Sequence, residues 1–561
     1  MRTTWILVLG ICCACTGIID DPSGREGAGG ATGSRGSADG SGAESAGLAA
    51  RTPTVRLTAR EYDNTLRTVF GAGFPAASGL ERLAVDAAVG RYDRNAVAVD
   101  VRTVETLQQL AEENAAAFAD RVDSLVTCDA PETRDCAEAT LATYGRRLFR
   151  RPLQTGELAV FTSLFDLGAA DEGHAGGYRL AVEALLQAPQ FLYRIEPGLE
   201  PDADGTYELG DHAIASRLSF FLWDGGPDDE LLDAADRGEL RTLEQIATQA
   251  RRMIADERFR ASLRDFHRQW LDLRGFDSVE KDPEVHPEFD AELKSSMLAA
   301  TMAFVEHVYL EDDATLETLL TASYAFADAR LAGFYGVDPP AEGLARVELD
   351  RERRAGLFTE PSVLSLYANG AGSDPIVRGL LIREWLMCMP PPPPPPDVVD
   401  DIASLQIDYE KPVRQRYEAT MREGTSCVGC HRSFNPIGFG LEHYDATGAY
   451  RLEDALVADE YDATVDATAD LSFVPGLEGV VVYGAPGMME RFVDFEPVQR
   501  CIAEQWYEYA LDRTPGRGDD EAIDGIVEGF ATSGFDLREL LVAIATSEAF
   551  RTNRLPAREE P

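Results

Sequence analysis

Apolar residues recur at every third or fourth position through most of the chain after residue 55. This spacing places one apolar stripe on a helix and therefore predicts amphipathic helices. The clearest stripes cover residues 107–118, 240–254, 259–273, 289–310 and 377–386. The last helix is expected to begin at Asp536, because Glu539 three residues later forms a capping-box-like pair ahead of an apolar face over residues 537–544.

Strand patterns are scarce by comparison. The main exception is the β-branched and aromatic run 480–483, which lies between two glycines. The sequence therefore predicts a mainly α protein.

Residues 427–431 have the sequence CVGCH, the C-x-x-C-H spacing of covalent haem attachment. In such a motif Cys427 and Cys430 bind the haem vinyl groups, and His431 coordinates the iron. Three other interpretations stay open: a redox-active cysteine pair, a structural disulfide, and half of a zinc site that also uses His443. Beyond residues 12–15, which lie in the expected export signal, the chain contains no second C-x-x-C, so a zinc ion would need a further ligand from elsewhere.

Two short apolar stripes flank this motif and predict an amphipathic helix on each side of it. They consist of Val413, Tyr417 and Met421 before the motif, and of Ile502, Trp506 and Tyr509 or Ala510 after it. A helix just before the haem-binding residues and a later helix that crosses it are typical of small cytochrome c domains. The order of the stripes therefore favours haem.

Haem is attached to this motif outside the cytoplasm, and residues 1–15 resemble an export signal. Met1 and Arg2 supply a positive start, and the apolar run 5–11 is far shorter than the roughly 18 residues of a membrane span. Cys15 follows Ala14 and resembles the lipidated cysteine of a bacterial lipoprotein, although Cys12 stands where that signal usually has Leu. We expect an outer-membrane lipoprotein that faces the periplasm or the cell surface and meets the membrane only through its lipid.

Composition predicts two non-globular segments. Residues 22–48 are rich in Gly, Ser and Ala, which is typical of a flexible tether, so folded structure is expected from about Val55. The seven prolines at 390–396 form a stiff polyproline segment, because proline suits neither a central strand nor a helix interior. We expect a boundary there, ahead of the haem motif.

Four cysteines remain once those of the signal, the lipid site and the haem motif are set aside: Cys128, Cys136, Cys388 and Cys501. An even number suits disulfide formation in an exported protein. We expect Cys128 to pair with Cys136 and Cys388 with Cys501, although four thiols allow three pairings.

The chain carries 52 Lys and Arg against 97 Asp and Glu, a net charge of −45. Such a surface repels phosphate backbones, so nucleic acid is not expected as a partner. It would attract a basic redox partner, and it also keeps an exported protein soluble. Asp462, Asp466 and Asp470 could bind calcium, but they do not fill an EF-hand pattern.

The order of longer motifs resembles the planctomycete-type multidomain cytochrome c family, also found in myxobacteria, whose members are strings of domains of unknown function. The segments that carry the resemblance are 56–67 for the opening module, 144–158 and 185–196 for the second, 214–240 for the third, 354–364, 374–379 and 427–451 for the fourth, and 501–513 and 540–550 for the last. The departures are small: Asp374 stands where Ser or Thr is expected, and His443 where Asn is more usual.

The resemblance implies several helical modules followed by a cytochrome c-like haem domain. The expected divisions are a signal at 1–15, a tether at 16–54, helical modules at 55–125, 137–200 and 205–335, the haem-motif module at 345–455 and a C-terminal helical module at 470–555. It also implies haem c as the cofactor. It says little about activity, because the family has no assigned reaction.

In a haem-bound protein, Cys427 and Cys430 would form the thioether bonds and His431 would coordinate the iron. We expect the other ring nitrogen of His431 to be held by an acceptor such as a backbone carbonyl near Pro436. For the opposite axial position we expect Met488 on the loop it shares with Met489. His443 and Met421 are the competing ligands.

Electron transfer is the function that follows, and two interpretations of the helical modules stay open. They form or dock an extracytoplasmic oxidoreductase that acts on a small molecule or a polymer, or they are a cell-surface binding scaffold in which the haem domain is a redox appendage or a structural element. Arg217, Trp223 and Asp224 could line a site, but a helix ending in a capped turn explains them equally well. Whether the protein is an enzyme is left undecided by the sequence.

Overall fold

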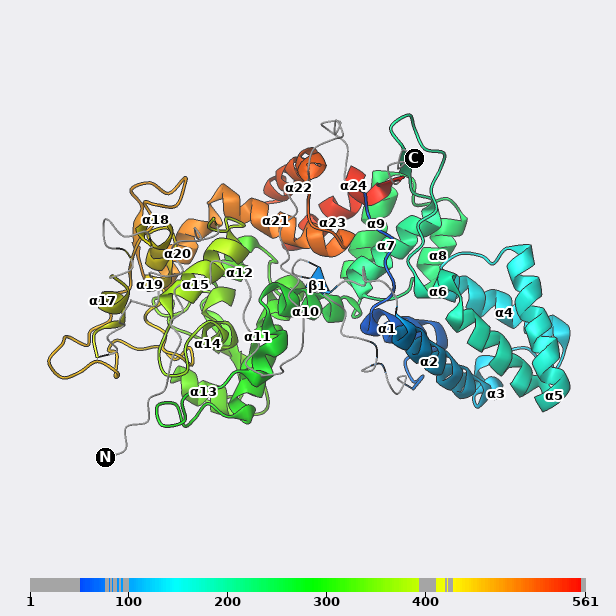
Figure 1. The fold of residues 1–561 in the computed structure, drawn as a ribbon, viewed down its shortest axis with the longest axis horizontal. Coiled ribbons are helices and arrows are strands. Elements are labelled where there is room, and N and C mark those ends of the chain that lie inside the picture. The colour runs from blue at the N-terminus through cyan, green and yellow to red at the C-terminus, as the bar shows by residue number, and fades with distance from the viewer. Residues whose placement is uncertain are drawn as a thin grey trace. The chain divides into compact units, whose positions relative to one another are not determined.

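Helices dominate the computed structural model of the chain (Figure 1). The structure describes residues 51–75, 80, 83, 88–89, 92–93, 100–392, 410–418, 421 and 427–555. Strands in these residues form four two-stranded antiparallel sheets. The prediction of a mainly α protein is confirmed.

Several expectations fall outside the described residues: the export signal with Cys15, the tether, and most of the proline run. Within the described part of the chain, no helix is both long enough and apolar enough to cross a membrane.

The chain forms two compact units, and neither is one continuous segment. The first, here called the motif unit because it contains Cys427, Cys430 and His431, consists of Gly275–Thr301 and Leu320–Cys501. The second, the terminal unit, consists of the described residues up to Arg274, Met302–Leu319 and the described residues from Ile502 onward. The divisions fall inside η2 (Leu273–Ser278), α11 (Ala291–Leu310), α12 (Leu316–Thr321) and α21 (Glu496–Leu511).

The terminal unit holds the first and the last described elements of the chain (Figure 1). Its helices are α1 (Ala59–Phe70), α2 (Val101–Ala119), α3 (Val122–Leu125), α4 (Arg134–Phe149), α5 (Thr155–Gln187), α6 (Pro189–Leu192), α7 (Asp211–Trp223), α8 (Asp229–Asp236), α9 (Leu243–Ile254), α10 (Phe259–Trp270), η7 (Arg517–Asp519), α22 (Asp520–Thr532), α23 (Leu537–Thr546) and α24 (Glu548–Arg551). Its strands are β1 (Ala88–Val89), β2 (Tyr92–Asp93), β3 (Thr206–Glu208) and β8 (Thr552–Arg554).

Helices α2 and α4 pack along α5 and enclose the core of the first part of the terminal unit. Phe118, Leu141, Tyr178 and Leu185 are fully buried there, which is where their helical spacing places them. A disulfide joins Cys128, in the turn before α4, to Cys136 in its first turn. This is the pair named from the sequence.

The C-terminal end of the described chain is bound to this unit through β3 and β8, which pair antiparallel with Thr206 opposite Arg554. Beside them Arg217 of α7 is 4% exposed and forms a two-bond ion pair with Glu196. Its remaining nitrogen donates to the backbone carbonyl of Phe550 at 2.8 Å. Arg217 therefore has a structural role, holding the last helix against α7.

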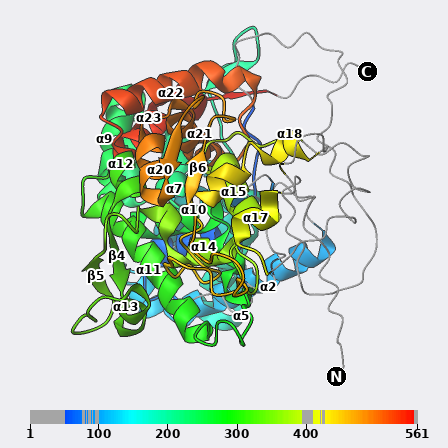
Figure 2. The ribbon, with the colours of Figure 1, turned by 90° about the vertical axis from the view of Figure 1, so that its left-hand side faces the viewer.

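The motif unit is built from shorter elements. They are β4 (Tyr324–Ala327), α13 (Ala329–Tyr335), β5 (Ala345–Glu348), η3 (Leu357–Thr359), α14 (Pro361–Leu366), α15 (Pro375–Leu381), the π-helical η4 (Ile382–Leu386), α17 (Val413–Glu418), α18 (Val428–His431), α19 (Asn435–Phe439), β6 (Thr468–Asp470), β7 (Val481–Tyr483) and α20 (Gly484–Val493). Strands β4 and β5 pair beside α13 (Figure 2).

Helices α15 and α19 pack at the centre of this unit with their backbones in close approach. A Cβ on Gly438 would overlap the carbonyl oxygen of Pro375, and one on Gly379 would overlap that of Phe434. Glycine is required at both positions because no side chain fits between the helices. Helix α15 precedes the proline run in the sequence and α19 follows it, and both helices belong to the motif unit.

Most sequence-predicted elements are confirmed. The stripes at 107–118, 259–273 and 289–310 correspond to α2, α10 and α11, and the strand-like run contains β7. Asp536 caps α23, its side chain accepting from the backbone N–H groups of Arg538 and Glu539. The stripe from residue 240 begins as a helix only at residue 243, because Thr242 forms a capping box with Gln245 and starts α9 there.

We predict that Gly438→Ala lowers the free energy of unfolding of the motif unit by roughly 2 kcal/mol, because the added methyl group forces α15 and α19 apart. Chemical denaturation of the full chain measures the change. Gly333→Ala in α13 is the matched control, since a Cβ there meets no atom within 4 Å. Equal denaturation midpoints for the two variants would contradict the proposed close packing.

Candidate functional site

The C-x-x-C-H residues occupy a single helical turn, α18, which Cys427 precedes as its N-terminal cap. The N–H groups of Cys430 and His431 both donate to the carbonyl of Cys427, at 3.2 and 3.1 Å. Residues three and four positions apart lie on the same helix face, so the two thiols and the imidazole are brought together. Both cysteines are free thiols; Cys427 is buried and Cys430 is half-buried.

The imidazole of His431 is 4% exposed and oriented by a side-chain hydrogen bond. Its Nδ1 lies 3.1 Å from Oδ1 of Asn435, which is itself fully buried. Donation from Nδ1–H to an amide oxygen leaves Nε2 with its lone pair for a metal. Burial lowers the pKa of His431, and this favours the neutral imidazole that a metal requires.

From the sequence we expect a backbone carbonyl near Pro436 to accept the hydrogen bond from His431. In the structure the acceptor is instead the side chain of Asn435. Asn435 was not singled out from the sequence. The sequence feature that could have identified it is its spacing, because Asn435 lies four residues after His431, at the start of the next helix.

Apolar side chains surround the motif. They form a cluster of Ile376, Leu380, Val413, Tyr417, Phe434 and Phe439, against which Met421 and Cys430 pack. Val413 and Tyr417 belong to α17, so the helix predicted just before the motif is present. The Phe434 ring also contacts the imidazole of His431, with ring centroids 4.9 Å apart. A thiol pair and one imidazole on an apolar face are the groups that a covalently bound porphyrin needs.

His443 lies in a different environment from the motif histidine. Its Nδ1 is 3.0 Å from the carbonyl oxygen of Arg451, and its Nε2 is 3.0 Å from the hydroxyl of Tyr483. Both ring nitrogens therefore have protein partners. Among the described residues, no group of three or more His, Cys, Asp and Glu side chains could hold a metal ion, so the zinc interpretation gains no ligand set.

The methionines considered as iron ligands lie in two places. Met488 is fully buried in α20, and its sulfur lies 3.1 Å from the point where a Cβ on Gly440 would stand. Gly440 directly follows α19, so Met488 packs against the segment that continues from the motif. Met421, like Cys430, packs against the apolar cluster.

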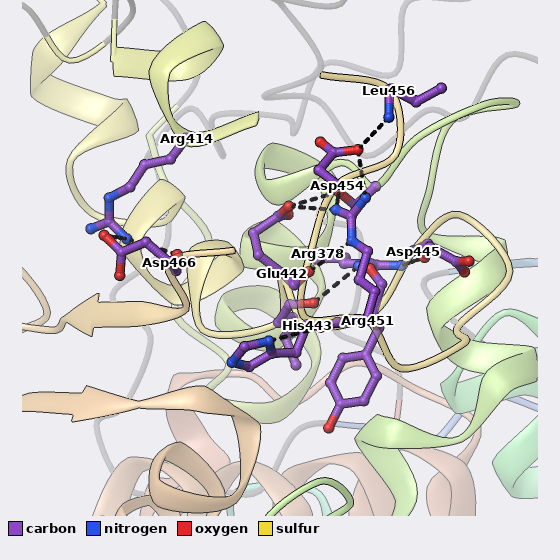
Figure 3. A network of polar contacts seen from close by, with 12 residues as sticks. Arg378, Arg414, Glu442, His443, Asp445, Arg451, Asp454, Leu456 and Asp466 are labelled. Carbon is purple, nitrogen blue, oxygen red and sulfur yellow. Dashed lines mark hydrogen bonds and ion pairs between the residues drawn. The ribbon is translucent and has the colours of Figure 1, made fainter. Parts of the chain in front are cut away.

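A buried polar network fixes the segment that follows the motif (Figure 3). Arg451 bridges two buried carboxylates: it donates to Glu442 at 3.1 Å and lies 3.0 Å from Asp454. Ser373 also donates to Glu442, at 2.8 Å. Burial raises the pKa of Glu442, while the charge of Arg451 opposes that rise.

Arg378 of α15 anchors the same segment from the other side (Figure 3). It is fully buried and donates to four backbone carbonyls, those of Leu364, Leu441, Tyr444 and Asp445. The loop after α19 is therefore held to the helix that packs against the motif.

A disulfide joins Cys388, just after η4, to Cys501 in α21. It is the second pair named from the sequence. The bridge closes a loop of chain that contains the whole C-x-x-C-H motif, and so restrains the segments on both sides of it.

The comparisons with known families agree with this arrangement. Five family models, each described as a protein of unknown function, match in order: DUF1587 at 56–119, DUF1595 at 136–196, DUF1592 at 209–337, DUF1588 (PSCyt3) at 354–454 and DUF1585 at 478–550. The chain belongs to the planctomycete-type multidomain cytochrome c family. No curated protein and no solved structure matches it.

In this cytochrome c family the model named PSCyt3 covers the C-x-x-C-H motif together with α15, α19 and the Glu442 network. Its name marks a cytochrome-related module. The DUF1592 match, at 209–337, runs from the terminal unit into the motif unit. The family modules are therefore segments of sequence, and they differ from the units in which the chain packs.

The other residues considered as a site, Trp223 and Asp224, end α7 in the terminal unit. The Trp223 ring is covered by the guanidinium of Arg258, 3.4 Å from the ring centroid, and its Nε1 donates to the carbonyl of Met253. Asp224 forms an ion pair with Arg60 and accepts from Asn64 at 3.1 Å. These contacts dock the turn after α7 onto α1, which is a structural role.

Proposed function

We propose that this chain is an exported c-type haem protein that transfers electrons as part of an extracytoplasmic oxidoreductase system. The observation that carries the proposal is the single turn α18, where two free thiols and a buried imidazole with an engaged Nδ1 come together beside an apolar cluster that packs against Cys430. Membership of a cytochrome-related family supports the same conclusion.

The residues present fit haem c. Cys427 and Cys430 would hold it, each thiol adding across a vinyl double bond to give a thioether, and His431 would bind the iron through Nε2. Bound haem supplies a reversible one-electron Fe(III)/Fe(II) couple. Asn435 keeps the imidazole in the tautomer needed for this, and the apolar cluster packs against Cys430.

For the sixth position we propose Met488. Its burial against Gly440, near the end of α19, supports this assignment, and the two engaged ring nitrogens of His443 make that residue a poorer ligand. A thioether donates less electron density to ferric iron than an imidazole does, so a methionine ligand raises the reduction potential.

The proposal includes export behind residues 1–15 and lipidation at Cys15 in the outer membrane, facing the periplasm or the cell surface. The sequence of that segment supports it. The partners that we propose are a redox protein or a small-molecule or polymer substrate. The net charge of −45 argues against nucleic acid.

A second candidate function is a cell-surface binding scaffold with a redox appendage. It is favoured by a pocket of 640 Å³ in the terminal unit, lined by Arg67, Tyr144, Arg147, Trp223 and Arg258 among others. Redox spectra of the holoprotein with candidate substrates separate the two. Reduction by one substrate class supports the oxidoreductase, whereas a reducible haem that responds to none supports the scaffold.

We predict that the purified protein carries one covalent haem that survives acid-acetone extraction, and that Cys427→Ala with Cys430→Ala abolishes it, because no thioether can then form. The pyridine haemochrome spectrum measures the haem. The matched control is Cys128→Ala with Cys136→Ala, which also removes two cysteines but leaves the motif intact. Complete extraction of haem from the unmodified protein would refute the proposed function.

We predict a weak near-infrared sulfur-to-iron band in the ferric protein, and its loss in the Met488→Ala, Met489→Ala double variant. Near-infrared absorption or magnetic circular dichroism detects it. Met421→Ala serves as the control and should retain the band. If the band disappears only in the Met421 variant, the sixth ligand is Met421 and the assignment of Met488 is wrong.

We predict that Cys15→Ser releases the protein from membranes, because the lipid is its only proposed attachment. Fractionation followed by immunoblotting measures the distribution, with Cys13→Ser as the neighbouring control. An unchanged membrane fraction for the Cys15 variant would rule out this anchor.

A further inference from the structure

Arg383 is a buried cation immediately beside the haem motif. It lies in η4, where the helix widens into a π-turn, and it is 9% exposed. Its Nε donates to the carbonyl of Met389 at 2.7 Å, and its Nη1 donates to the carbonyl of Ser433 at 3.0 Å. The Ser433 hydroxyl in turn donates to the carbonyl of Cys430 at 2.7 Å. The guanidinium is thus bound directly to the turn that joins α18 to α19.

The charge of Arg383 has little compensation. In the part of the chain that the structure describes, no carboxylate lies within 4.0 Å of its nitrogens; its hydrogen-bond partners are neutral carbonyls. Burial lowers its pKa, and Cys430 and the half-exposed Glu384 raise it. A guanidinium nevertheless stays protonated in proteins. Once Cys430 forms a thioether it can no longer become negatively charged, whereas the guanidinium next to it keeps its positive charge.

Asn435 provides a neutral hydrogen-bond acceptor at the motif. It accepts from Nδ1 of His431 with a neutral amide oxygen. A carboxylate acceptor would push the imidazole toward imidazolate and stabilise ferric iron, whereas an amide does so much less. Charges near a water-excluded site act strongly because the local dielectric constant is low.

We infer that Arg383 raises the reduction potential of the haem and that Asn435, as a neutral acceptor, avoids lowering it. The inference rests on the proposed function and adds to it two residues that set the potential of the haem. The gain of one electron by ferric haem removes one positive charge from the site. A fixed cation beside the haem favours that reduced state, and a neutral acceptor on His431 avoids opposing it.

The test is a spectroscopic redox titration of the full-length holoprotein and its variants. Arg383→Met removes the charge and should shift the midpoint potential downward. Arg383→Lys keeps the positive charge but loses the two hydrogen bonds of the guanidinium. Its midpoint potential should stay close to that of the unmodified protein. Asn435→Asp adds a negative charge at almost constant volume and should also shift the midpoint downward. Arg150→Met is the matched control, because Arg150 is equally buried among backbone carbonyls but lies in the terminal unit.

The outcomes separate this inference from the proposed function. Equal shifts for the Met and Lys variants at position 383 would show that packing sets the potential and overturn the role of its charge. An unshifted Asn435→Asp midpoint would overturn the role of the amide, even if the variants at 383 failed to fold. Absence of covalent haem in the unmodified protein would instead refute the proposed function itself.

Discussion

The close approach of α15 and α19 at Gly379 and Gly438 is the contact on which the rest of the motif unit depends. It brings together two segments that lie on opposite sides of the proline run. Helix α15 continues into η4, which carries Arg383, while α19 begins with Asn435. One backbone contact therefore sets the distance between the haem motif and the groups that surround it.

The same helix supports the segment beyond the motif. Arg378 uses its guanidinium to bind four carbonyls, and Arg451 bridges Glu442 and Asp454 next to it. Buried ionic groups are costly unless they are paired and hydrogen-bonded. Arg451 pairs with both carboxylates. By contrast, Nε of Arg378, Oε1 of Glu442 and Oδ2 of Asp454 have no hydrogen-bond partner among the described residues. The network fixes the position of the loop, because each carbonyl oxygen must point at the same rigid guanidinium group.

Periodicity predicted the longer amphipathic helices, such as α2, α9, α10 and α11, because their apolar faces depend only on neighbours three and four residues away. It also placed the C-x-x-C-H turn correctly between two helices. Arg383 was not found, because its importance comes from proximity to Ser433, fifty residues later in the sequence. From the sequence, Arg217 and Trp223 could either line a site or stabilise the fold. Their contacts in the structure, with Glu196 and Phe550 for Arg217 and with Met253 for Trp223, favour the structural role. The family modules recognised in the sequence do not correspond to the two compact units. The reason is that single helices, α11 and α21, contribute residues to both units.

The pairing of β3 with β8 has a consequence for the order in which the protein can fold. Arg217 and its acceptor in α24 are 333 residues apart in sequence. At ribosomal rates of roughly 5 to 20 residues per second, that interval lasts about 20 seconds to a minute. Until then β3 has an unpaired edge, which other strands can join. The terminal unit therefore closes last, after all residues of the motif unit have been synthesised.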